Sequence, residues 1–338
     1  MIFTGSEKVQ KAKLALLTMI RHQWEHGVAA HAFIDSGDDR IAVMLAHEAV
    51  YRQMPDGRLA GVSHTTNITD PCVCGESVMF AYRQTGDEKY RRAAVKMLEY
   101  IDSAPADADG LQLHNTKQPM IAADCMYMLP PFYAVMGEYE KAFRQADLRF
   151  KLLWNDDKHA MNHQYDVEKK TLWRDKRWGA ASGWTAAAFA RMLNIIPKDY
   201  ASDKPDGPTS SFNSGLIASG RKMLTGLLNQ VVEGVLPYQL DCGLFYDCLD
   251  DDTTFIETNC AQMMAYAIYE GVSGGYLPEK HIASADRMRA AANAMMDDYG
   301  YIQGAAGAPS FDFYGISPEA QAFYILMETA ADKYRARS

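Results

Sequence analysis

Short motifs of a glycine followed by acidic residues divide the first half of the chain at nearly even intervals. The three motifs are Ser36-Gly37-Asp38-Asp39-Arg40, Thr85-Gly86-Asp87-Glu88-Lys89 and Met136-Gly137-Glu138-Tyr139-Glu140. A glycine after the last helical turn readily adopts the left-handed conformation that ends many helices, and an acidic residue just beyond it suits the N-terminus of the next helix. The glycines are 49 and 51 residues apart, which leaves room for two helices and a long return loop. The pattern therefore predicts a chain of αα-hairpins.

The apolar residues indicate helices along most of the chain. Leu17, Ile20, Trp24 and Val28 share one helical face and predict a single helix over residues 7–34. Later helices are expected over roughly residues 180–194, 212–231, 256–272, 281–297 and 317–333, with long loops near 103–118, 155–178, 234–255 and 298–316. No alternating run predicts a central sheet, although short strands fit the long loops. Five to six hairpins fit the length, so we expect an all-α, closed double ring of helices in one domain over residues 1–338.

The composition excludes several functional classes. Hydrophobic residues make up 48% of the 338 residues and charged residues 23%, as in globular proteins with a substantial core. The net charge of −9 argues against general binding to nucleic acid or to anionic membranes, which favour basic faces. No segment approaches the roughly 20 apolar residues that span a bilayer, and the first residues lack the features of a signal peptide. Six cysteines in so long a chain do not indicate a disulfide scaffold, so we expect a cytoplasmic protein with free thiols.

Two aspartates occupy comparable places in adjacent hairpins. Asp70 precedes a helix that starts near Cys72, and Asp124 lies inside or at the start of the first helix of the next hairpin. Both can therefore point into one central cavity, where two carboxylates drive their pKa values apart and leave one protonated as an acid. Asp70 can equally be a simple N-cap. Asp124 lies among apolar residues, where a carboxylate is costly unless it has a partner or a task.

Aromatic residues gather at the junctions of loops and helices. Trp178 and Trp184 enclose the small-residue turn Gly-Ala-Ala-Ser-Gly, an arrangement that favours contact with a ligand over core packing. For any single tryptophan, Trp24 included, packing in the core is the more common role. His163 falls in a long polar loop, where it either binds a sugar hydroxyl or carboxylate or is simply exposed.

A short motif raises the alternative of a zinc protease. His22 and His26 match the H-x-x-E-H signature of inverted-motif metalloproteases, with both histidines one turn apart on a helix. The surrounding hairpins lack the sheet that accompanies this signature in those proteases, so the match is a weak indication. Cys72, Cys74 and Cys125 flank the two aspartates but lack the usual spacing of structural zinc sites. We therefore expect no metal.

Several segments together resemble the six-hairpin glycosidases. The likeness is to the unsaturated rhamnogalacturonyl hydrolases of glycoside hydrolase family 105 and to the related family 88. It runs through HQWEHGVAAHAF, TDPCVCGESVMFAYRQTGDEKY, AADCMYMLPPFYAVMGEYEKAFRQ, MNHQYD, RWGAASGW, FIETNCAQMMAYAIYEGV and GISPEAQAFYILMETAADKY. The strongest motif is D-x-x-Y-M-x-x-P-F-x-A-x-x-G, from Asp124 to Gly137.

The resemblance implies an (α/α)6 barrel and an unusual glycoside hydrolysis. In that chemistry an aspartic acid protonates the double bond of a Δ4,5-unsaturated uronic acid, water adds at C5, and the product opens to a keto acid. Asp124 matches the proton donor and Asp70 the second active-site aspartate. The residues implied to contact substrate are Trp24, His163, Trp178, Ser182 and Trp184. No cofactor is implied, and the expected partner is a short oligosaccharide with a uronic acid end, with a homo-oligomer left open.

This chain departs from the family pattern where the substrate is recognised. Ala180 stands where the family segment W-G-R-G-N-G-W has arginine, Ser182 replaces its asparagine, and Ala122 occupies a place that is often tryptophan. The lost arginine removes a cation suited to a carboxylate. The residues left to supply that charge are Arg83, Lys117, Arg174 and Arg177.

Other activities on a similar barrel stay open at this point. One is a hydrolase of saturated uronides or other glycosides, with Asp70 and Asp124 as an acid/base pair. Another is a sugar epimerase that uses His22, His26 and His163 as proton carriers. A sugar-binding protein without catalysis is the last.

Overall fold

A computed structural model describes residues 3–62, 66–198, 214–308 and 310–337. Within these ranges, no helix combines the length and apolar composition that crossing a membrane requires. The helices of the described residues are α1 (Glu7–Met19), α2 (Gln23–Asp35), α3 (Asp39–Tyr51), α4 (Cys74–Thr85), α5 (Glu88–Ser103), α6 (Cys125–Val135), α7 (Tyr139–Leu153), α8 (Gly179–Ile195), α9 (Ser214–Val235), α10 (Asn259–Gly274), α11 (Ile282–Ala294) and α12 (Pro318–Arg335).

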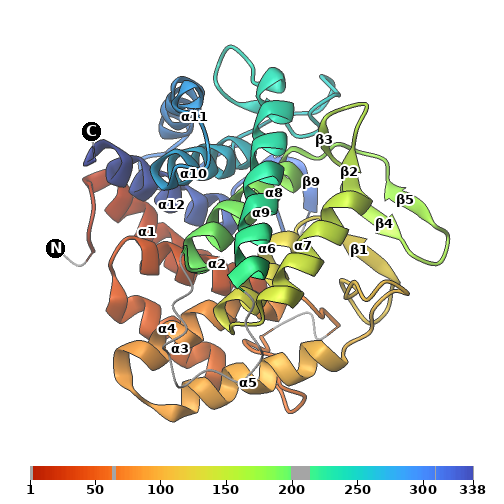
Figure 1. Ribbon diagram of the computed structural model, residues 1–338. Coiled ribbons are helices and arrows are strands. Elements are labelled where there is room, and N and C mark those ends of the chain that lie inside the picture. The colour runs from red at the N-terminus through yellow and green to blue at the C-terminus, as the bar shows by residue number, and fades with distance from the viewer. Residues whose placement is uncertain (1–2, 63–65, 199–213, 309, 338) are drawn as a thin grey trace.

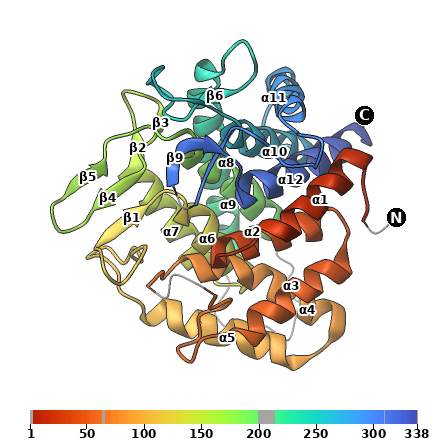
Figure 2. The same cartoon turned by 180° about the vertical axis from the view of Figure 1, so that it is seen from behind.

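The helices form two concentric rings (Figures 1 and 2). Even-numbered helices make the inner ring, in which each packs against the next and α12 packs against α2 to close the circle. Each odd-numbered helix lies outside against an inner neighbour, as α9 does against α8 and α1 against α12. The architecture is an (α/α)6 barrel, and the predicted fold class is confirmed.

The sequence of each helix explains its ring. Every residue of α8 from Gly179 to Leu193 is buried, and a helix that is apolar on all sides is stable only inside. Helix α5 instead buries a single stripe that includes Tyr90, Ala94 and Met97, and most of its other side chains are charged. Alternation of these two helix types along the chain builds one core between the rings.

Short antiparallel hairpins occupy the loops, and the described residues contain no central sheet. Strands β1 (Met120–Ala122), β4 (Gln164–Asp166) and β5 (Thr171–Arg174) form one sheet with β4 in the middle. The two-stranded pairs are β2 (Trp154–Asn155) with β3 (Ala160–Met161), β6 (Phe245–Tyr246) with β7 (Ile256–Glu257), and β8 (Ala305–Gly307) with β9 (Ser310–Gly315). The pairing of Ile121 with Tyr165 sets the register between β1 and β4.

The single helix predicted over residues 7–34 is wrong, because the chain breaks between α1 and α2. Ile20 adopts an extended conformation after α1. The Glu25 carboxylate accepts hydrogen bonds from the Arg21 amide at 2.5 Å and the His22 amide at 2.8 Å. This capping box begins a new helix at Gln23, and it overrides an apolar periodicity that continues across the break.

The three punctuating glycines behave as predicted. Gly37, Gly86 and Gly137 have φ values of 76°, 69° and 81°, in the left-handed region. The acidic residues after them differ: the Asp87 carboxylate caps α5 by accepting from the Lys89 amide at 2.9 Å, whereas that of Asp38 pairs with the buried Lys13 ammonium at 2.5 Å. The predicted helix over residues 212–231 begins outside the described residues, and α9 continues to Val235. All six cysteines are free thiols.

Candidate active site

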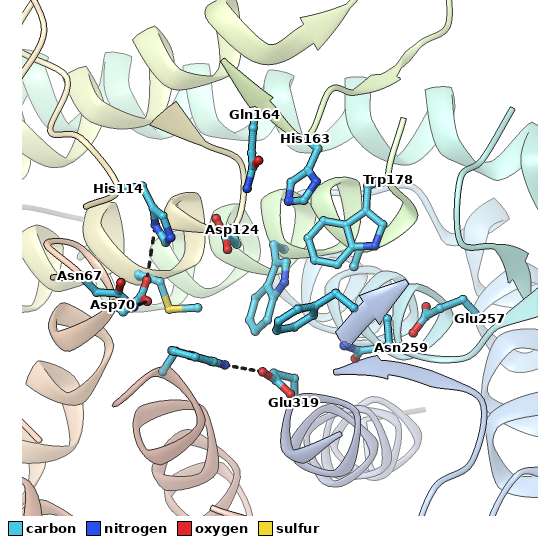
Figure 3. Close-up of a pocket in the computed structure, with 16 residues that line it drawn as sticks. Asn67, Asp70, His114, Asp124, His163, Gln164, Trp178, Glu257, Asn259 and Glu319 are labelled. Atoms are coloured by element: carbon cyan, nitrogen blue, oxygen red, sulfur yellow. Dashed lines mark hydrogen bonds and ion pairs between the residues drawn. The ribbon is translucent and has the colours of Figure 1, made fainter. Parts of the chain in front are cut away.

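The N-terminal ends of the inner helices surround one cavity of about 260 Å³ (Figure 3). Unpaired N–H groups give each helix N-terminus a partial positive charge, so the cavity lies where these charges add. One residue at each of these ends lines it: Trp24 in α2, Asp70 in the 3-10 helix η1 (Asp70–Val73) that leads into α4, Asp124 before α6, Ala180 in α8, Asn259 in α10 and Glu319 in α12.

Loops and hairpins complete the lining. Ala306 and Phe311 come from the β8–β9 hairpin. Met128 and Trp184 lie one turn further along α6 and α8, and the remaining lining residues are Asn67, His114, His163, Gln164, Trp178 and Glu257. The cavity thus combines residues from both ends of the chain.

Asp124 is the N-cap of α6. Its Oδ1 accepts a hydrogen bond from the Cys125 amide at 2.9 Å, which satisfies one of the donors that a helix start leaves unpaired. The preceding Ala123 amide donates to the His163 carbonyl at 3.0 Å, and Ala122 pairs with Gln164 in the sheet. These backbone bonds bring the His163 and Gln164 side chains beside Asp124.

Asp70 is almost fully buried, with 4% of its surface exposed. Burial, helped by the Asp124 and Glu319 carboxylates and opposed by His114 and Asn67, raises the pKa of its carboxyl to about 6. The Asn67 amide donates to its Oδ2, and the His114 Nδ1 lies 3.8 Å from its Oδ1. Asp70 therefore changes charge near neutral pH, which favours an active role over that of a plain helix cap.

His114 lies beside Asp70 and contacts Cys125, the residue after Asp124. Its backbone is held on both sides, since its carbonyl accepts from the Ile68 amide at 2.9 Å and its amide donates to the Met120 carbonyl at 2.7 Å. Its Nδ1 lies 3.2 Å from the Cys125 Sγ. Burial alone would lower the pKa of the imidazole, but Cys125 and Asp70 together raise it well above its usual value. The imidazole of His114 is therefore more readily protonated than a free one, and it lies beside the Asp70 carboxyl.

Asp70, His114 and Cys125 also form the one group of potential metal ligands found among the described residues, with the three ligand atoms within 4.8 Å of one another. The types suit zinc, yet the Cys125 thiol already accepts from the Thr69 hydroxyl at 3.0 Å. Hydrogen bonds of Cys125 with Thr69 and His114, together with the Asp70–His114 ion pair, account for the trio.

The residues of the H-x-x-E-H motif do not form a zinc site in the described structure. His26 Nε2 lies 2.6 Å from the Glu48 carboxylate, and Glu25 serves as the cap of α2. His22 stacks on Trp24 and lines a different hollow. The fold explains the spacing instead, because a capping box needs a glutamate three residues after the N-cap.

The side of the cavity away from Asp70 carries two more buried carboxyl groups (Figure 3). Burial raises the pKa of Glu257 to about 8, although backbone amides, chiefly that of Cys260, oppose the rise. Burial and the nearby Glu25 raise the pKa of Glu319 to about 7. The Trp24 indole donates to Glu319 Oε1. Neither glutamate was expected from the sequence.

The expected aromatic residues lie in the cavity lining. Trp24, Trp178 and Trp184 all line it. The Trp178 indole donates to Asp247 at 3.0 Å and its ring centre lies 4.5 Å from that of His163. Trp178 is therefore held by a hydrogen bond while its ring faces the site.

Ser182 is not among the lining residues, which departs from the expected contact with substrate. It is fully buried, and its Oγ accepts a hydrogen bond from the Met161 amide at 3.1 Å. That bond ties α8 to β3, so the position supports the fold of the β2–β3 hairpin. Whether a serine in the first turn of a helix faces the cavity or a neighbouring element depends on the rotation of the helix about its axis. The local sequence does not reveal that rotation.

The described lining contains no lysine or arginine, so the replacement cation expected from the sequence is missing there. Arg177 pairs with Asp250 at 2.9 Å and also with Asp175. Arg83 and Lys117 do not line the cavity. The side chain of Arg174 lies outside the described part of the structure.

The barrel and its cavity of carboxyl groups and indole rings define a protein of the glycoside hydrolase type. The model of the family described as Glycosyl Hydrolase Family 88 matches residues 4–206 and 217–328, which is most of the chain. The chain belongs to Glycosyl Hydrolase Family 88, and the resemblance seen in the sequence is confirmed.

Individual relatives agree with this membership. An unsaturated rhamnogalacturonyl hydrolase, YesR, of Bacillus subtilis (strain 168) is 22% identical over 222 residues, which are 62% of this chain and 58% of that protein, so the match spans less than two thirds of the relative. A structure described as a possible member of glycoside hydrolase family 105, from Salmonella enterica subsp. enterica serovar Paratyphi A str. ATCC 9150, has a TM-score of 0.80 at 16% identity, covering 98% of this chain and 93% of that one. A family 105 glycoside hydrolase from C. acetobutylicum ATCC 824 has a TM-score of 0.77 at 20% identity, covering 97% and 99%. The two structures show the shared fold.

Sequence reasoning missed several lining residues for identifiable reasons. His114 and Asn67 lie in loops without a local motif, and only tertiary contacts bring them beside Asp70. Glu257 and Glu319 had a usable signal, because Glu319 stands in the first turn of α12 and Glu257 two residues before α10, much as Asp70 and Asp124 stand at earlier helices. The rule that picked out the two aspartates, applied to every inner helix, would have found both glutamates.

Proposed function

We propose that the protein is a glycoside hydrolase that releases a Δ4,5-unsaturated uronic acid from the end of short oligosaccharides, with Asp124 as the proton donor. The observation that carries this proposal is that Asp124 and Asp70 line one cavity at the starts of neighbouring inner helices. Indole rings in the same lining suit the faces of sugars. Membership of Glycosyl Hydrolase Family 88 supports the same chemistry.

The proposed reaction uses one carboxyl group as acid and then as base. Asp124 gives its proton to C4 of the enol ether, which leaves positive charge shared between C5 and the ring oxygen. The Asp124 carboxylate then takes a proton from water as the water oxygen bonds to C5. The resulting hemiketal opens to a C5 ketone, and C1 becomes an aldehyde as it releases the remaining sugar as an alcohol. Asp124 ends protonated, as it began.

Asp70 and His114 are assigned supporting roles. Asp70 lies 3.8 Å from the His114 Nδ1, and both groups line the cavity. A carboxylate on Asp70 stabilises the imidazolium of His114, which in turn offers positive charge to the substrate carboxylate. The six helix N-termini add to this potential, so the substrate carboxylate meets positive charge in a lining without arginine.

The missing arginine favours one second candidate. A hydrolase of saturated uronides or other glycosides would use Asp70 and Asp124 as an acid/base pair. The pKa of about 6 at Asp70 suits a proton donor near neutral pH, and a neutral sugar would need no cation from the lining. The two schemes require opposite protonation states of Asp70, which makes them separable by pH.

The decisive experiment follows the ultraviolet absorbance of the conjugated enol ether during incubation with unsaturated disaccharides from rhamnogalacturonan and other lyase digests. The wild-type protein is expected to remove the signal, and Asp124→Asn to slow its removal by about 10³-fold or more. Asparagine is as good an N-cap as aspartate, so the variant should keep its melting temperature.

Asp109→Asn, in an exposed loop, is the matched control and should act like wild type. Wild-type turnover by Asp124→Asn would contradict the assignment. Unchanged absorbance across the whole panel, with release of saturated sugars from other glycosides, would favour the second candidate.

A further inference from the structure

Among the described residues, Arg149 in α7 is the largest side chain that the fold buries completely. An arginine keeps its charge at neutral pH, and taking that charge out of water costs free energy unless carboxylates pair with it. The Arg149 Nε and Nη1 atoms have no hydrogen-bond partner among the described residues. Burial lowers the pKa of the guanidinium, although Cys125 and Asp124 oppose the fall. Stability alone therefore does not explain an arginine at this position.

The guanidinium reaches the loop that carries His114. Arg149 Nη2 donates a hydrogen bond to the Gln112 carbonyl at 3.1 Å. Gln112 is a buried residue, two positions before His114, and the His114 side chain lines the cavity. The bond therefore joins an outer helix to the segment that brings His114 into the cavity lining.

The backbone bonds around His114 come from other loops and hairpins. The Leu113 amide donates to the Pro105 carbonyl at 3.0 Å, the His114 amide donates to the Met120 carbonyl at 2.7 Å, and the Ile68 amide donates to the His114 carbonyl at 2.9 Å. None of these three partners belongs to a helix, so the bonds fix the segments relative to one another. The bond from Arg149 fixes them relative to α7, and α7 packs against α6.

The position of His114 matters because its contacts are short. Its Nδ1 lies 3.8 Å from Asp70 Oδ1 and 3.2 Å from Cys125 Sγ, and Figure 3 shows the imidazole directed at Asp70. A misplacement of about 1 Å in an active site can cost up to about 10²-fold in rate. A loop segment held this closely needs an anchor in the rigid part of the barrel.

We propose that Arg149 is a positioning residue, which holds His114 against Asp70 through its bond to the Gln112 carbonyl. Arg149 does not itself contact substrate, because it is fully buried and is not among the residues that line the cavity. Its effect on substrate binding rests on the proposed function, in which His114 offers positive charge to the substrate carboxylate. Its effect on the position of His114 does not.

Gln145 provides a matched comparison on the same helix. It lies one turn before Arg149 and is 4% exposed, and its Nε2 donates to the Gly110 carbonyl at 2.7 Å. Gly110 belongs to a turn that the Asp107 carboxylate also holds through backbone amides. Gln145→Met therefore removes an anchor from the same loop, but not the anchor next to His114.

The first test measures kcat and KM in the ultraviolet assay with an unsaturated disaccharide. Arg149→Met keeps much of the bulk and removes the charge and the donors, so KM should rise at least about 10-fold while kcat stays within about 3-fold. Gln145→Met should leave KM within about 3-fold. A merely structural role would lower the amount of active protein, and so the apparent kcat, without raising KM.

A double-mutant cycle with His114→Ala tests whether Arg149 acts through His114. In the His114→Ala background, Arg149→Met should change KM by less than about 2-fold, because the group that it positions is already gone. Arg149→Lys keeps the charge and one donor for the same carbonyl, so it should recover most of the loss in KM. Effects that multiply in the double variant, or a lysine variant as impaired as the methionine one, would overturn the inference.

A crystal structure of Arg149→Met gives a test that needs no turnover. The distance from His114 Nδ1 to Asp70 Oδ1 should exceed the wild-type 3.8 Å by more than about 1 Å. An unchanged distance would overturn the inference, and so would a variant that does not fold, which would mark Arg149 as a residue of the core. If the wild-type protein hydrates no disaccharide, the proposed function fails, while a displaced His114 in the variant keeps the positioning role.

Discussion

At the scale of single residues, the cavity depends on carboxyl groups whose charge is set by burial. Asp70, Glu257 and Glu319 have pKa values raised to about 6, 8 and 7. Each lies at the start of an inner helix or just before one, where a local bond fixes it while the surrounding apolar core removes water. Their protonation therefore responds to pH in the range where the protein is assayed.

The pH dependence of kcat/KM should distinguish the two candidate reactions. In the proposed hydration Asp70 acts as a carboxylate, so kcat/KM should fall as the pH drops below about 6, where Asp70 gains its proton. Asp70→Asn should lower kcat/KM by about 10²-fold and remove this acid limb. Asp109→Asn, in an exposed loop, serves as control, because it should leave the acid limb at the same pH. A rate that falls as the pH rises through 6 would assign Asp70 as the acid of the second candidate.

Ser182→Ala separates a structural role from contact with substrate. Removing the hydroxyl leaves the buried Met161 amide without its acceptor, so the free energy of unfolding should fall by about 1–3 kcal/mol in chemical denaturation. KM should not change. Ser219→Ala, at an exposed position of α9, is the control and should be neutral within about 0.5 kcal/mol. An increase in KM without loss of stability would return Ser182 to the substrate site.

At the scale of secondary-structure elements, close packing of inner helices positions the acids. Gly27 in α2 lies against η1, and a Cβ atom there would be 2.7 Å from the Val73 carbonyl carbon and 2.9 Å from the Cys74 nitrogen. Because backbone cannot give way as a flexible side chain does, only glycine permits this approach. The contact sets the position of η1, and therefore of Asp70 at its first residue.

Gly27→Ala should consequently move η1 and weaken both stability and catalysis. We expect the free energy of unfolding to fall by about 2–3 kcal/mol, within the range for overpacked cores, and kcat to fall with it. Gly226→Ala is the matched control, since a Cβ atom in that part of α9 meets nothing within 4 Å. Its higher helix propensity should raise stability by about 0.5–1 kcal/mol. Equal effects of the two substitutions in thermal and chemical unfolding would contradict this account of the packing.

At the scale of the whole molecule, the barrel turns six helix starts toward one cavity and buries several carboxyl groups there. When the pKa of a carboxyl is higher in the folded state, the carboxyl loses its proton at a higher pH in the folded protein than in the unfolded chain. Folding is then opposed increasingly as the pH rises from the unfolded to the folded value. For Glu257 that interval runs from 4.5 to about 8, and for Glu319 from 4.5 to about 7.

Stability should therefore be lower at about pH 8 than at about pH 5, and Glu257→Gln should reduce the difference. The relative stabilisation of the variant should grow by about 3 kcal/mol between these pH values, since each pH unit in the interval is worth about 1.4 kcal/mol. Glu7→Gln, at an exposed position of α1, should leave the pH dependence unchanged. The prediction would be wrong if urea titrations gave the variant and the wild-type protein the same pH dependence of stability. That result would mean that folding does not raise the pKa of Glu257.

The amino-acid sequence by itself determined the helical hairpins, the barrel class and the two aspartates. Glycine caps, apolar periodicity and the motif from Asp124 to Gly137 are local signals, so they can be recognised in the sequence without a structure. The burial of Ser182 against β3 and the approach of His114 to Asp70 were decided only by tertiary structure. The physical reason is that burial and hydrogen-bond partners depend on residues far apart in sequence, and closure of the ring is what brings them together.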